Sequence, residues 1–136
     1  MNRWTRGLVA MMGLALLTGG CTLSPEEKVS REQALKQAVD SFSESVVQQR
    51  WDEAFKLTDG SFETVDKMKS HLMQPWVQDS TLTGGQIASM AWISDTIAKV
   101  KLNWTFQTGS VESFSSETFV WVWKGNNWKY RGRSLR

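Results

Sequence analysis

A nine-residue run of strict alternation constrains the fold of this chain most. Apolar Ala98, Val100, Leu102, Trp104 and Phe106 fall on one face of an extended strand, and the polar or charged residues between them fall on the other. This pattern is typical of an antiparallel strand with one face on a core and the other in solvent. The rest of the chain must therefore supply neighbouring strands and a cover for the apolar face.

Further strand patterns flank the alternating run. Residues 86–94 predict a strand before it, and residues 114–123 and 128–131 predict two strands after it. Lys124-Gly125-Asn126-Asn127 is typical of a tight hairpin turn between the last two. The second half of the chain therefore predicts four antiparallel strands.

Helical patterns occupy the part of the chain before these strands. Ser30 and Gln33 have the spacing of a capping box, which predicts a helix that starts at Ser30 and ends near residue 49. Two shorter helices are predicted over 51–58 and 61–75. The apolar stripe of the first helix comprises Leu35, Ala38, Val39, Phe42 and Val46. Three helices followed by four strands predict an α+β fold with the helices packed on one side of a curved antiparallel sheet.

The first twenty residues have the proportions of a secretory signal peptide. Arg3 and Arg6 precede an apolar run of 11 residues from Gly7 to Leu17, which is shorter than the roughly 20 residues needed to span a bilayer. The segment Leu17-Thr18-Gly19-Gly20-Cys21 then resembles a bacterial lipobox. The resemblance implies cleavage between Gly20 and Cys21 and attachment of lipid, including palmitate, to Cys21. An ordinary signal peptide with a stray cysteine, or an uncleaved anchor, is the alternative.

The lipobox resemblance implies the expected domain organisation and cellular location. Residues 1–20 form the signal peptide, residues 21–29 the lipidated cysteine and a polar tether, and residues 30–136 a single domain. Thr22 after the cysteine favours the outer membrane, with the domain in the periplasm. Because Cys21 is the only cysteine, none remains for a disulfide or a nucleophile.

Charge is unevenly distributed along the expected mature chain. Residues 21–95 hold 7 basic and 12 acidic residues, and residues 96–136 hold 7 basic and 2 acidic residues. This difference predicts an acidic helical part and a basic sheet part. Outside the cytoplasm, a basic surface favours an acidic protein or an anionic envelope polymer over nucleic acid.

Three segments, together with the order of elements, resemble the nuclear-transport-factor-2-like (NTF2-like) superfamily. These segments are residues 49–55 after the long first helix, the hairpin at 94–100, and the ending at 122–130. The family has a cone-shaped fold shared with ketosteroid isomerases and SnoaL cyclases. The resemblance covers residues 30–131 and implies the fold rather than an activity. Small lipoproteins of this type resemble binding or assembly modules more often than enzymes.

Aromatic residues supply the candidate pocket. The chain has eight tryptophans, and plain core packing in a small domain without disulfides is one interpretation. A concave pocket for a lipid, a glycan or a peptide is the other. The candidate pocket residues are Phe42, Trp51, Trp92, Trp104, Phe106 and Tyr130.

A candidate interface comes from residues 119–123, which are apolar on both faces of the predicted strand. The second face must be covered by the chain's own helix or tail, by a partner, or by a second copy. On the partner hypothesis, glutamate at Val120 or Val122 would abolish association without unfolding the domain. The candidate interface residues are Val120, Trp121, Val122, Trp123, Arg131 and Arg133.

Catalytic candidates are few. Tyr130 with a carboxylate could serve an isomerase- or dehydratase-like reaction, but a hydrogen-bonded core tyrosine is the commoner case. His71 is expected at the surface, and no nucleophile is paired with a base. One histidine and one lipidated cysteine exclude a metal site, and no cofactor is expected.

These patterns together predict a membrane-anchored periplasmic lipoprotein without catalytic activity. It would bind an envelope protein, a second copy of itself or a small apolar ligand, and no nucleic acid. The alternatives are a small isomerase- or dehydratase-like enzyme with an aromatic pocket and a structural subunit of an envelope secretion machine.

Overall fold

A computed structural model of the chain describes residues 23–134. The chain divides within its long helix into two compact units, Met1–Gln33 and Ala34–Arg136, and each is described by itself. The predicted signal peptide, its cleavage site and the lipidation site Cys21 lie outside the described residues. Over residues 23–134, no helix is both long enough and apolar enough to cross a membrane.

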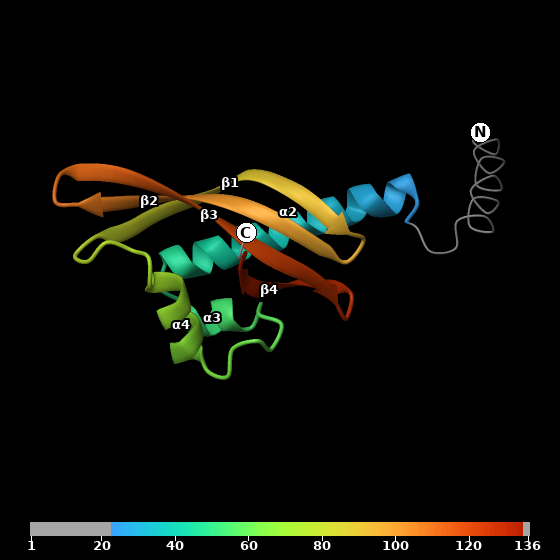
Figure 1. The fold of residues 1–136 in the computed structure, drawn as a ribbon, viewed down its shortest axis with the longest axis horizontal. Coiled ribbons are helices and arrows are strands. Elements are labelled where there is room, and N and C mark those ends of the chain that lie inside the picture. Colours follow the sequence, from blue (N-terminus) through green and yellow to red (C-terminus); the bar gives the residue numbers. More distant parts are fainter. Residues whose placement is uncertain (1–22, 135–136) are drawn as a thin grey trace, which may run out of the picture. The chain divides into compact units, whose positions relative to one another are not determined.

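Three helices precede four strands, as the sequence predicts (Figure 1). Each strand pairs antiparallel with the next, so the order in the sheet is β1-β2-β3-β4. The α+β fold is therefore confirmed. The elements are α2 (Pro25–Val47), α3 (Trp51–Phe55), α4 (Val65–Met73), β1 (Thr81–Ser94), β2 (Ile97–Thr108), β3 (Val111–Lys124) and β4 (Asn127–Arg133).

The start of α2 differs from the prediction. The N–H of Glu27 donates to the Ser24 hydroxyl at 3.2 Å, and the N–H of Ser24 donates to the Glu27 carboxylate at 3.0 Å. This is the reciprocal pairing of a capping box, and Pro25 supplies the fixed φ that suits a first helical residue. The prediction of an N-cap at Ser30 was therefore wrong, and residues 25–29, predicted as a tether, are helical.

The core lies between the second unit's part of α2 and the sheet. The alternating residues of β2 are buried, as predicted. The α2 stripe packs in the same core: Phe42 meets the ring of Trp121 on the neighbouring strand β3 edge-on at 5.5 Å. The buried members of that stripe are Leu35, Val39, Phe42 and Val46.

β1 starts at Thr81, earlier than the predicted start at residue 86, and runs through Gly84 and Gly85. A Cβ at Gly85 would lie 2.7 Å from the ring of Trp104. Gly85 therefore makes room for an indole on the neighbouring strand and does not end β1. The pairing of β1 with β2 shifts register at three places, which marks β1 as a bulged strand.

The free edge of β4 is covered by the segment that follows α3. The N–H of Tyr130 donates to the carbonyl of Leu57 at 2.7 Å, and the N–H of Asp59 donates to the carbonyl of Tyr130 at 3.0 Å. Thr58 thereby forms a parallel bridge with Tyr130. Residues 57–59 thus pair with the backbone of β4 in the way that a short edge strand would.

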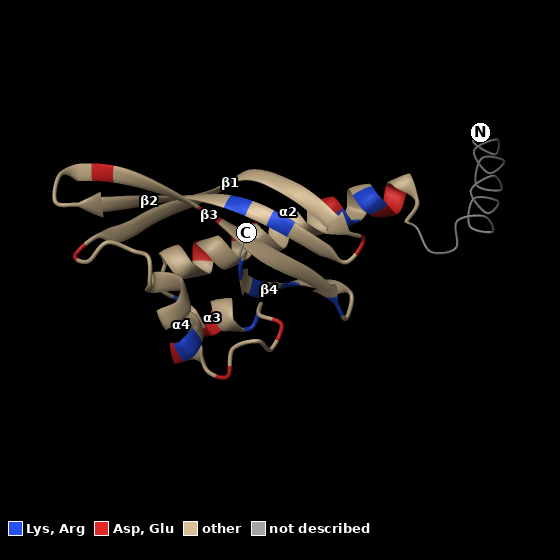
Figure 2. Ribbon diagram, viewed as in Figure 1, with Lys and Arg blue, Asp and Glu red and all other residues tan. Residues whose placement is uncertain are grey.

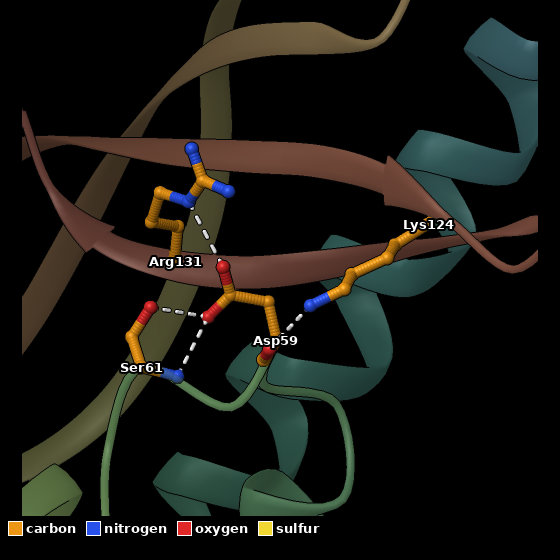
Figure 3. Close-up of polar contacts among 4 residues, drawn as sticks. All are labelled: Asp59, Ser61, Lys124 and Arg131. Carbon is orange, nitrogen blue, oxygen red and sulfur yellow. Dashed lines mark hydrogen bonds and ion pairs between the residues drawn. The ribbon is translucent and has the colours of Figure 1, made fainter.

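Side chains fix this segment to the sheet (Figure 3). Arg131 Nε donates to the Asp59 carboxylate at 2.9 Å, Lys124 Nζ donates to the Asp59 carbonyl at 2.9 Å, and Ser61 donates to the same carboxylate. In Figure 2 the blue Lys and Arg positions of β4 and of the turn before it mark the part of the sheet to which Asp59 is bound. The charge difference read from the sequence is therefore partly neutralised where these two segments meet.

Candidate binding site

Tyr130 points into the core from β4 and is fully buried. Phe42 and Phe62 stack on its ring at centroid distances of 4.5 and 5.9 Å, and Phe119 and Trp121 meet it edge-on at 5.4 and 5.7 Å. These four rings occupy the space in which a ligand pocket was expected. Around Tyr130 the aromatic residues therefore form packed core and not a ligand pocket.

Polar groups also lie close to Tyr130. Arg133 Nε donates to Glu117 at 3.1 Å, and Arg133 Nη2 donates to the carbonyl of His71 at 3.0 Å. Burial raises the pKa of Tyr130 far above its ordinary value; the charge of Arg133 opposes that rise and the charge of Glu117 adds to it. Tyr130 therefore stays protonated and cannot serve as a general base.

His71 is not at the surface, as the sequence suggested, but half-buried on the inner side of α4. Its ring lies 5.0 Å from that of Phe62 and 6.3 Å from that of Tyr130, centroid to centroid. Burial, and secondly the charge of Arg133, lowers the pKa of His71 below 6.5. The prediction was wrong because β4 and the residues before α4 close over this face of the helix.

Sequence reasoning also missed Glu117. It pairs with Leu102 on β2, so it faces the core, and its side chain is only 9% exposed. The signal was present: residues 117, 119 and 121 alternate onto one strand face. A strand predicted to start at residue 114 already contained it.

A groove opens where the end of α2, the start of α3, the side of α4 that carries Lys69 and Met73, and the start of β1 come together. Its volume is about 160 Å³. Two indoles and four aliphatic or thioether side chains form its apolar walls: Val46, Val47, Trp51, Met73, Trp76 and Leu82. This combination makes it the best candidate for a ligand site in the described part of the chain.

Polar groups of the groove come from α4, from the start of β1 and from the residues that flank α2 and β1. They are Gln49, Lys69, Ser80 and Thr81. The Lys69 ammonium lies 5.5 Å from the centre of the Trp51 ring, within cation–π range. Gln49 closes α2 with a φ of 60°, a left-handed conformation that glycine usually supplies at a helix end. The groove thus has an aromatic wall with one positive charge over it.

Trp76 is held in place by the core. Its ring meets Trp104 at 6.2 Å and Phe106 at 5.4 Å, both edge-on. Trp76 was not predicted as a site residue, because it follows Pro75 in a segment without helix or strand periodicity. An isolated indole in such a polar link was the only signal for it.

The six candidate pocket residues do not surround one cavity. Phe42, Trp104 and Tyr130 are fully buried and Phe106 nearly so. Trp51 is the member that lines the groove. Trp92 is 41% exposed at the far end of β1, where it packs on Trp128 at 5.4 Å.

The candidate interface residues are also divided by the fold. Trp121 is fully buried and Val122 is 4% exposed, so neither can contact a partner, and the interface prediction is wrong for these two. Glutamate at Val122 would bury a charge and unfold the domain. Trp123 packs on Trp128 at 5.4 Å, which leaves Val120, half-buried on the outer face, as the apolar member of the set.

The two arginines of the interface set are engaged within the chain. Arg131 pairs with Asp59 at 2.9 Å and Arg133 with Glu117 at 3.1 Å. In residues 23–134, no group of three or more His, Cys, Asp or Glu is arranged to hold a metal ion.

Comparison with known proteins identifies the fold. No protein-family model and no curated protein matches the sequence. An NTF-2 like protein of unknown function from Shewanella oneidensis MR-1 is 11% identical, with a TM-score of 0.51, over 80% of this chain and 96% of that chain. A putative Ca/calmodulin-dependent kinase II association domain from Exiguobacterium sibiricum 255-15 is 14% identical, with a TM-score of 0.52, over 82% and 93% of the two chains. The chain therefore has an NTF2-like fold, which fits a binding module or an enzyme-like one.

Proposed function

We propose that this protein is a lipid-anchored binding module of the bacterial envelope, without catalytic activity, and that the groove beside Trp51 is its ligand site. One contrast supports binding over catalysis. The interior around Tyr130 is filled by aromatic rings, whereas the groove is open and lined by two indoles. An apolar group would gain burial in the groove without displacing any part of the core.

The enzyme alternative is less well supported. It needs Tyr130 and a neighbouring carboxylate to reach a substrate, and Glu117 is the acid beside it. Glu117 is engaged by Arg133 at 3.1 Å, and rings enclose Tyr130. A substrate would have to displace core side chains to reach either group.

Equilibrium dialysis of a labelled one-ring compound tests the groove. The full chain is held in lipid nanodiscs, with empty nanodiscs as the blank, and labelled phenylacetate and phenylacetamide are the probes. We expect the wild type to retain probe and Trp51→Ala to lose it. Trp92→Ala is the matched control, because that exposed indole lies at the other end of β1. Equal retention by both variants would argue against the groove.

The anchor is proposed on Cys21 after the apolar run of residues 7–17. Each buried methylene of a lipid contributes about 0.8 kcal/mol, so more than one acyl chain would hold the domain stably at a membrane. Metabolic labelling with an alkyne palmitate tests this. The wild type should carry label and fractionate with the outer membrane, and Cys21→Ala should lose both. Label on the Cys21→Ala chain would contradict the proposal.

We also propose a protein contact, with an envelope protein or a second copy, on the outer face of the sheet. Val120 is half-buried there, and Phe114 on the same strand face is 71% exposed. Native mass spectrometry of the full lipoprotein extracted from its own envelope tests it. A stoichiometric partner should be present in the wild type and absent in Val120→Glu. A wild type that is strictly monomeric and without a partner would end this proposal.

A further inference from the structure

We propose that the groove binds a small carboxylic acid whose apolar part is one aromatic ring or a branched aliphatic chain. The inference rests on the proposed function, because it assigns a ligand class to the same groove. The size of the groove, the chemistry of its walls and its charge each restrict the ligand.

The size restricts the ligand to a single ring or its equivalent. The groove holds about 160 Å³, close to the roughly 150 Å³ of an engineered apolar cavity that binds benzene. Pockets for drug-sized ligands are larger, about 300–1,000 Å³. A whole lipid or an oligosaccharide would therefore not fit inside it.

The walls favour a flat or branched apolar group. Trp51 and Trp76 offer indole surfaces, and Leu82 and Val46 add aliphatic ones. Trp76 is positioned by its edge contacts with Trp104 and Phe106, so this wall is in place before a ligand arrives. A preformed wall costs little ordering on binding.

The charge of the groove selects the polar end of the ligand. Lys69 is its one charged lining residue, and no acidic residue of the described chain lines it. No carboxylate within residues 23–134 lies within ion-pair distance of Lys69. Lys67, two residues before Lys69 on α4, does not line the groove and pairs with Glu63 at 2.6 Å. Lys69 is partly buried as a residue, and an ammonium with no carboxylate of the described chain beside it is matched by a carboxylate on the ligand.

The position of Lys69 indicates how the charged end and the apolar end of such a ligand are arranged. Its ammonium lies 5.5 Å from the Trp51 ring centre, so a carboxylate paired with Lys69 is attached to a group that lies along the indole. The cation–π contact keeps the ammonium at the aromatic wall in the free protein. Phenylacetate has this arrangement of ring and carboxylate, and phenylacetamide has the same shape without the charge.

Dialysis of these two probes against the full chain in nanodiscs tests the inference. We expect the wild type to bind phenylacetate about tenfold more tightly than phenylacetamide, the difference that a charge-assisted hydrogen bond makes. Lys69→Met should remove this preference by weakening phenylacetate about tenfold while phenylacetamide is unchanged. The preference of the wild type should also shrink as salt is raised.

Lys67→Met is the matched control, since it removes the same charge from the same helix outside the groove. It should leave the affinity of both probes unchanged. Equal affinity of the wild type for both probes, or a loss of phenylacetate binding in Lys67→Met as large as in Lys69→Met, would overturn the inference and leave the proposed function standing. Failure of both probes to bind would overturn the groove as a ligand site altogether.

Discussion

The two edges of the sheet are protected in different ways. The edge of β4 is closed by the chain itself: residues 57–59 pair with its backbone, and Asp59 ties that segment to Arg131. The edge of β1 receives no such cover within the described residues. It carries three register shifts instead, which interrupt a continuous row of unpaired backbone groups.

This difference between the two edges indicates that the β4 edge contributes mainly to stability and that the β1 edge is the one available for binding. β4 is short and alternately buried, and Tyr130 at its centre contacts four aromatic rings of the core. β1 is twice as long, but Leu82, 9% exposed, is its one buried residue. The groove opens at the start of β1. A site at the loosely packed edge can accept a ligand without loss of core contacts.

The largest expected effect comes from truncating the centre of the closed edge. Tyr130→Ala should lower the free energy of unfolding by about 3–5 kcal/mol, because four ring contacts are lost and a cavity remains. Trp92→Ala on the open edge should cost about 1 kcal/mol, since that indole is 41% exposed. Urea unfolding measures both. Similar losses at the two positions would show that the edges do not differ in this way.

A pair of neighbouring glycines then tests the inner face of β1. Gly85→Ala should cost about 1–3 kcal/mol, because its Cβ would lie 2.7 Å from the Trp104 ring and the indole would have to move. Gly84→Ala should change stability by less than about 0.5 kcal/mol, since its nearest neighbour would be the Thr105 side chain at 3.8 Å. Thermal or urea unfolding of the two variants checks this. If Gly84→Ala were the more damaging, the assigned register of β1 and β2 would be incorrect.

Removal of the Asp59 carboxylate should have a smaller effect on the closed edge. Burial alone would raise the pKa of Asp59, but hydrogen bonds from Ser61 and Arg131 and the charge of Arg131 lower it below 3.8. The folded chain therefore binds fewer protons here than the unfolded chain, and the added stability is present above pH 3.8 and is lost as the pH falls through the lowered pKa. Asp59→Asn should cost about 1 kcal/mol near pH 7, because Arg131 is half-exposed.

The pH dependence gives this variant its control. In acid, below the lowered pKa of Asp59, wild type and Asp59→Asn should unfold at the same urea concentration. Asp79→Asn, which removes an exposed carboxylate just before β1, should match the wild type near pH 7. A constant difference between Asp59→Asn and wild type down to strong acid would contradict the charge argument.

The smallest effect is expected at His71, a residue of α4 whose ring lies 6.3 Å from that of Tyr130 on the closed edge. Its pKa is lowered below 6.5 in the folded chain. As the pH falls below 6.5, the imidazole therefore binds a proton more readily in the unfolded chain than in the folded chain. Stability should therefore fall as the pH drops from about 7.5 to about 5.5. His71→Gln should lose part of this dependence, as measured by urea midpoints at the two pH values. An identical pH dependence in wild type and variant would show that His71 is not its source.

Regular elements were largely predictable because their signals are local. The alternation of residues 98–106 and the stripe of α2 each state which face is buried, and burial follows them closely. Element boundaries were less predictable. Two segments with capping-box spacing lie six residues apart at Ser24 and Ser30, and the pairing of Ser24 with Glu27 at the first turn sets the helix start.

The sites were less accessible to sequence reasoning, for a physical reason. Trp76 carries no periodicity of its own, and its role appears only when α4 and β1 bring it against Phe106 and beside Lys69. Val122 has the sequence environment of an interface residue, yet it is buried within the chain.

By itself, the sequence determined the order of the elements, the faces of α2 and β2 that are buried, and the hairpin at Gly125-Asn126, where both residues adopt positive φ. Only the tertiary structure decided that Asp59 meets Arg131, 72 residues away, and that the Arg133 guanidinium meets the carbonyl of His71, 62 residues away. Local patterns record which side of an element avoids water, because periodicity follows from backbone geometry. They do not record which distant side chains then share the space between elements, because that depends on how the elements pack.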